Sequence, residues 1–100
     1  MKMDHHLGAA PIAIAVCSDL HARNLTALLH EVCEHRGVLP HEVCGHSRTL
    51  GVCRARHELW WRIRNDSARH YSYAEIARLF RRDHTTVLHG VQAHRRRQQP

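Results

Sequence analysis

The side chains best suited to chemistry lie together near the C-terminal end, in the string Arg82-Asp83-His84-Thr85-Thr86-Val87-Leu88-His89-Gly90-Val91-Gln92. An aspartate is typical of a helix N-cap, so the polar residues that follow it fall on the first exposed turn of a predicted helix. Imidazole and hydroxyl groups can hydrogen-bond to base edges, and a threonine methyl can pack on a thymine methyl. The string therefore predicts a helix whose first turn, His84, Thr85 and Thr86, reads bases in a DNA major groove.

A shorter helix is predicted directly upstream, over residues 72–80. Ser72 and Glu75 have the spacing of a capping box, and three apolar residues follow at helical spacing: Ile76, Leu79 and Phe80. Arg81 and Arg82 then form the turn and are candidates for contacts with the DNA backbone. Two short helices joined by a tight turn, the second with a polar N-terminus, are the arrangement of a helix-turn-helix.

The rest of the chain also predicts helices and shows no strand alternation. We expect one helix that is capped at Ser18-Asp19 or Asn24 and ends at Gly37, a short one over residues 40–44, and a long one over about 50–64. The predicted fold is all-α, a compact domain of about five helices over residues 18–97. Residues 1–17 are expected to be a lead, either flexible or a short helix.

Positive charge is concentrated in the second half of the chain. Residues 1–45 carry three basic and five acidic side chains, whereas residues 46–100 carry twelve arginines against four acidic residues, a net charge of +8. Arginine stays charged and binds phosphate and guanine through two donors at once. This half has the electrostatic character of a nucleic-acid-binding surface; the competing interpretation is a merely solvated basic face.

Other classes of function find little support in the sequence. A chain of 100 residues has room for one modest core, and it contains no glycine-rich phosphate loop followed by lysine. No paired carboxylates and no nucleophile with a base suggest catalysis, so we expect neither an enzyme nor a cofactor. The four cysteines form no Cys-x-x-Cys pair, and we expect no metal site. They are predicted to be small core residues in a reducing compartment.

A membrane location is not expected either. The apolar run over residues 8–16 is interrupted by Pro11 and is too short to cross a bilayer. As a signal peptide it is weak, because acidic and histidine residues precede it. We expect a cytoplasmic protein of a bacterial cell, with a phage or plasmid origin left open.

The quoted residues resemble a known family. Tyr73-Ala74-Glu75-Ile76 to Phe80 and Arg82-Asp83-His84-Thr85-Thr86-Val87-Leu88-His89 look like the signature of the C-terminal helix-turn-helix domain of the bacterial replication initiator DnaA. Upstream, residues 34–44 and 54–59 are similar to earlier helices of that domain, so the resemblance covers roughly residues 24–96. It implies recognition of a duplex site like the DnaA box, rich in A·T pairs.

Site residues follow from the resemblance by position. Asp83, His84, Thr85 and Thr86 fall at base-reading positions of the major groove. Arg48 falls where the family places an arginine that enters the minor groove, where a narrow A·T tract concentrates negative potential. The positions of contacts with the DNA backbone are taken by Arg56, His57, Arg81 and Arg82.

The chain also departs from the family pattern. The family's nucleotide-binding core is missing, so we expect a regulator of replication or transcription without its own ATPase. Only Arg81 separates Phe80 from Arg82, where the family often has glycines. His57 stands where glutamine is common, and Ala93 where lysine is common. Other replication or regulatory proteins are expected as partners, and the alternative function is a helical protein-interaction module that binds DNA only non-specifically.

Overall fold

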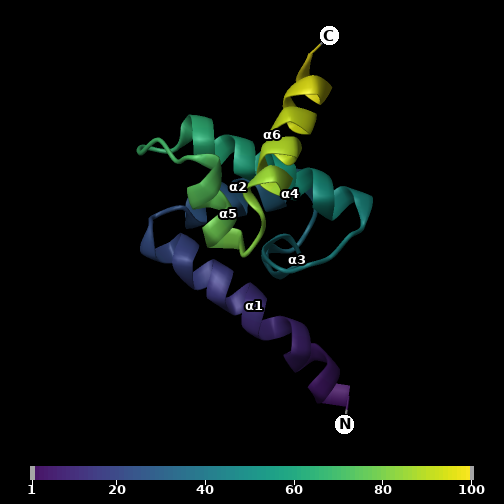
Figure 1. The fold of residues 1–100 in the computed structure, drawn as a ribbon. Helices are drawn as coiled ribbons and strands as arrows, with labels where there is room; N and C mark the ends of the chain where they lie inside the picture. Colours follow the sequence, from purple (N-terminus) through teal and green to yellow (C-terminus); the bar gives the residue numbers. More distant parts are fainter. Residues whose placement is uncertain (1, 100) are drawn as a thin grey trace.

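The computed structural model describes residues 2–99, and helices are the only regular elements in that range (Figure 1). They are α1 (Lys2–Ala22), α2 (Thr26–Arg36), α3 (Pro40–Cys44), α4 (Leu50–Asp66), α5 (Tyr73–Phe80) and α6 (His84–Gln98). The all-α prediction is confirmed. The described residues form six helices where about five were expected, because most of the predicted lead is helical.

Helix α4 lies at the centre and packs against α2, α3, α5 and α6. Its residues Leu59, Trp60 and Ile63 are fully buried, and the Trp60 ring meets the Phe80 ring edge-on with centroids 5.8 Å apart. Trp61 is only half-buried, so the two adjacent tryptophans divide between core and surface as their spacing on a helix predicts. This core fixes the position of α5 and α6 on one side of α4.

Helix α1 packs against α3 and α5 through one side, while its N-terminal part extends beyond the other helices (Figure 1). Ala13, Val16 and Leu20 are buried. The expected boundary between residues 17 and 18 therefore falls inside one continuous helix. Pro11, which lacks a backbone donor, also lies within α1.

The predicted cap of the next helix was wrong. Ser18 and Asp19 lie inside α1, and Asn24 lies in the turn after it with a φ of 60°, a left-handed conformation that asparagine tolerates. Leu25 occupies the N-cap of α2 instead. The predicted end at Gly37 is confirmed, with a φ of 67° that suits glycine.

Candidate nucleic-acid interface

Helix α5 begins with the predicted capping box. The Ser72 hydroxyl accepts a hydrogen bond from the Glu75 backbone N–H at 3.1 Å, and the Glu75 carboxylate accepts one from the Ser72 backbone N–H at 2.9 Å. The bond from the Ser72 backbone, helped by Arg69, lowers the pKa of Glu75 to about 2. The two hydrogen bonds of the capping box restrain the start of α5, which packs against α6.

The turn between α5 and α6 is closed by a strained arginine. Arg81 has φ 55° and ψ 48°, a left-handed conformation that favours glycine, and its backbone ends α5. The Arg82 N–H donates to the Ala77 carbonyl oxygen at 2.8 Å, which completes the helix terminus. One residue in this conformation thus makes the tight turn that the short linker demands.

Helix α6 presents its predicted reading residues to solvent. Asp83 occupies the N-cap, and its carbonyl oxygen accepts bonds from the Thr86 and Val87 N–H groups. Asp83, His84, Thr85 and Thr86 are all exposed. The prediction that Asp83 stands at the N-cap is confirmed, but its side chain makes no capping hydrogen bond. Asp83 is exposed, so its carboxylate is open to solvent beside the polar first turn.

The opposite face of α6 packs against α4 at close range. Val87 and Val91 are buried, and a side-chain carbon added at Gly90 would lie 2.7 Å from His57 and 2.8 Å from Trp60. Glycine is therefore required where the two helices cross. This packing sets the rotation of α6 and turns residues 84–86 outward. His89, further along α6, is exposed.

Arg48 lies exposed in the loop between α3 and α4, and a second arginine holds that loop. Arg56 Nε donates to the Val43 carbonyl oxygen at 2.9 Å, and its Nη2 lies 3.0–3.1 Å from the carbonyl oxygens of Glu42, Gly45 and Ser47. Only 3% of Arg56 is exposed. The structure corrects the expected backbone contact, because this guanidinium is used inside the fold and is not available to a phosphate.

Arg82 connects the same loop to the helix-turn-helix. Its Nη2 donates to the Gly45 carbonyl oxygen at 2.8 Å, the atom that also accepts from Arg56. The loop that carries Arg48 and the turn that precedes α6 therefore meet at one carbonyl group. Arg82 is half-buried, and burial is the first cause that lowers its pKa, followed by the positive charge of Arg48.

Positive potential accumulates around this junction. The pKa of His46 is lowered, first by burial and then by the charges of Arg82, Arg56 and Arg48. Three guanidinium groups thus act on one imidazole between the loop and the turn. A concentration of positive charge next to exposed hydrogen-bonding side chains suits the approach of a phosphate backbone.

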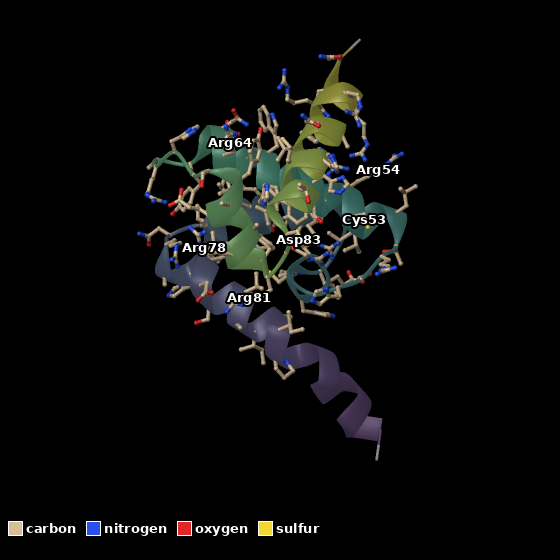
Figure 2. All side chains as sticks on the ribbon, in the orientation of Figure 1. Cys53, Arg54, Arg64, Arg78, Arg81 and Asp83 are labelled. Carbon is tan, nitrogen blue, oxygen red and sulfur yellow. The ribbon has the colours of Figure 1, made fainter. Side chains whose placement is uncertain are left out.

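Arg81, in the same turn, forms an ion pair with α1 instead of contacting the Arg48 loop. The Arg81 Nη1 lies 2.6 Å from a carboxylate oxygen of Asp19 on α1 and also donates to the Leu79 carbonyl oxygen. Figure 2 shows the Arg81 label between α5 and α1, away from that of Asp83. A phosphate contact from Arg81 would have to share the guanidinium with Asp19.

His57 lies half-buried between α4 and α6. Its Nδ1 is 3.4 Å from the Arg97 Nη2, and its ring centroid is 5.7 Å from that of Trp60. Burial, followed by the charge of Arg97, lowers the pKa of His57 to about 4. The imidazole is neutral near pH 7, so it brings no positive charge to a DNA backbone.

Two further observations concern the described residues as a whole. None of their helices is both long enough and apolar enough to span a bilayer. Within the same residues, no group of three histidine, cysteine or acidic side chains is arranged to hold a metal ion.

The comparison with known families agrees with this geometry. The family model of the bacterial DnaA protein helix-turn-helix matches residues 25–93. The chain belongs to this family. Searches of curated proteins and of solved structures give no match. The two-helix unit of α5 and α6 is thus a DnaA-type helix-turn-helix, a DNA-binding motif, and the matched residues include the Arg48 loop.

The sequence did not reveal two residues that shape this DnaA-type site. Gly45 supplies the carbonyl group at the junction, and a side chain there would come within 2.9 Å of the His41 carbonyl oxygen. Gly90 allows α4 and α6 to approach. An isolated glycine within a helical pattern is a signal of close packing, but it does not identify the neighbour.

Proposed function

We propose that this protein binds duplex DNA with sequence preference, at a site like the DnaA box, and regulates replication or transcription in a bacterial cell. In this proposal, the first turn of α6 enters the major groove and Arg48 enters the adjacent minor groove. Asp83, His84, Thr85 and Thr86 contact base edges, and Arg82 lies against the phosphate backbone between the two grooves.

The main support for the proposal is the junction between the Arg48 loop and the turn before α6. The Gly45 carbonyl oxygen accepts hydrogen bonds from both Arg56 and Arg82, which ties the Arg48 loop to the turn before α6. The two reading elements are therefore held relative to each other before DNA binds. Preorganisation of this kind reduces the ordering cost of binding.

The division of roles follows from groove chemistry. The major groove distinguishes all four base pairs, so exposed hydroxyl, imidazole and carboxylate groups on α6 can be selective there. The minor groove mainly separates A·T from G·C pairs, and its narrow A·T tracts attract arginine. Arg48 should therefore add a preference for A·T pairs at one flank of the site.

Fluorescence anisotropy of the purified protein tests the proposal. It compares a duplex that carries a DnaA-box-like site with a scrambled duplex of equal length and composition, each at low and high salt. We expect tighter binding to the box at both salt concentrations. If about six phosphates are contacted, the slope of log K against log salt should be near −5.

Equal affinity for both duplexes, with complete loss at high salt, would contradict sequence preference and would favour a protein-interaction module that binds DNA only non-specifically.

A third duplex, in which G·C pairs replace the flanking A·T pairs, tests the role of Arg48 in the minor groove. Arg48→Ala should abolish the difference between this duplex and the original box. A difference that survives the substitution would remove Arg48 from the minor groove.

A further inference from the structure

Two thiol groups face each other between α1 and α3. The Cys17 Sγ lies 3.2 Å from the Cys44 Sγ, although the residues are 27 positions apart in the sequence. Both are free cysteines. Bond formation requires the sulfur atoms to approach to about 2.05 Å, a movement of roughly 1 Å.

The two thiols differ in access to solvent. Cys17 is half-buried, whereas Cys44 is 1% exposed and Cys33, which lies near both, is 3% exposed. Burial raises the pKa of Cys33 to about 11 and raises that of Cys44 further above its ordinary value. A soluble reagent therefore reaches Cys17 first, and Cys44 is placed to react with the product.

We propose that Cys17 and Cys44 form a reversible intramolecular disulfide when the protein meets a low-molecular-weight disulfide such as oxidised glutathione. The Cys17 thiolate attacks one sulfur of the reagent, forms a mixed disulfide and releases one glutathione thiolate. The Cys44 sulfur then attacks Cys17, and its proton passes to the second glutathione as it leaves. The protein loses two electrons and two protons, and one oxidised glutathione becomes two reduced molecules.

The position of the pair gives this bond a structural consequence. Cys44 ends α3 and directly precedes Gly45, whose carbonyl oxygen joins the Arg48 loop to Arg82. Ala13 of α1 lies within 4.0 Å of the side-chain position at Gly45. The disulfide would fasten α1 to the base of that loop, and it would restrict the unfolded chain by closing a long loop.

The experiment uses the full chain with Cys53→Ser, because Cys53 is the other half-buried thiol and would react with the same reagent. After incubation with oxidised glutathione, we expect the thiol count to fall from three to one. The mass should fall by two hydrogen atoms with no glutathione adduct. Peptide mapping should join Cys17 to Cys44, and dithiothreitol should reverse the change.

Two matched variants separate the steps. Cys44→Ala removes the resolving thiol and should leave a stable glutathione adduct on Cys17. Cys17→Ser should give no adduct and no disulfide, because the remaining thiols are buried. The oxidised parent should also unfold at a higher temperature than its reduced form, which shows that both are folded. Retention of all three thiols, a persistent adduct in the parent, or a bond between Cys17 and Cys33 would overturn the proposal.

Discussion

The Asp83 carboxylate at the start of α6 makes no capping hydrogen bond, and the side chains of Thr85 and Thr86 are open to solvent. Polar groups in this state can exchange water for base edges without breaking an internal contact. The exposed first turn and the buried Val87 and Val91 lie on one helix, so packing in the core fixes where residues 84–86 point.

Substitution of an exposed residue in the first turn of α6 should weaken binding to the box-like duplex and leave binding to a scrambled duplex unchanged. We expect Thr85→Ala and His84→Ala each to weaken binding to a box-like duplex by about 1–3 kcal/mol, since each would remove one of the proposed base contacts. Anisotropy titrations on the box and on a scrambled duplex measure both effects. If the loss is equal on the two duplexes, these residues do not read bases.

Arg56 acts on the fold rather than on DNA. Arg56→Ala leaves buried carbonyl groups of the Arg48 loop without a donor, and we expect a loss of about 3 kcal/mol in the free energy of unfolding. Arg54→Ala is the matched control, because Arg54 is an exposed arginine on the same helix. Urea denaturation compares them. Similar stability of the two variants would mean that the Arg56 hydrogen bonds contribute little.

At the scale of elements, local signals predicted the helix-turn-helix well. The capping box at Ser72 and Glu75 was predicted from spacing alone and forms as expected. The role of Arg56 could not be predicted in this way, because its acceptors belong to residues 42–47 and meet it only after α3 packs on α4. A short helix was one of two alternatives for residues 1–17, but the length of α1 was not predicted, because Pro11 interrupts its apolar run and its packing partners are distant in sequence.

The strained turn gives an element-scale prediction. The left-handed conformation costs a residue other than glycine about 1–2 kcal/mol, and a β-branched side chain suffers most. Arg81→Gly should therefore be nearly neutral, because relief of strain offsets the loss of the exposed ion pair with Asp19. Arg81→Val should be less stable than Arg81→Gly by about 1–2 kcal/mol.

Thermal unfolding of the two variants tests this account of the turn. A valine variant as stable as the glycine variant would show that residue 81 does not require a left-handed backbone. Circular dichroism at the same time reports whether the variants keep the total helical content of the protein.

At the scale of the whole molecule, one half-buried and one buried histidine should make stability depend on pH. Burial lowers the pKa of His57 to about 4 and also lowers that of His94, from an ordinary value of 6.5. Below pH 6.5 these two histidines bind protons in the unfolded chain but stay neutral in the folded protein until the pH is lower. The neutral histidines therefore contribute their full stabilisation of the folded state above pH 6.5. This contribution is lost progressively as the pH falls toward 4.

Acidification should therefore lower the midpoint of thermal unfolding between about pH 7.5 and about pH 5. His57→Gln should reduce this dependence, whereas His30→Gln, at an exposed position on α2, should leave it unchanged. Equal slopes for both variants would show that His57 is not responsible for the acid sensitivity.

The central claim is that the first turn of α6 and the Arg48 loop form one DNA-reading surface. Backbone amide NMR shifts of the labelled protein, titrated with a box-like duplex, test it most directly. The account predicts that the largest changes fall on residues 83–86 and on the loop around Arg48, with small changes at Trp61, whose ring packs against His94 in the C-terminal half of α6. Large changes around Trp61, with residues 83–86 unaffected, would contradict it.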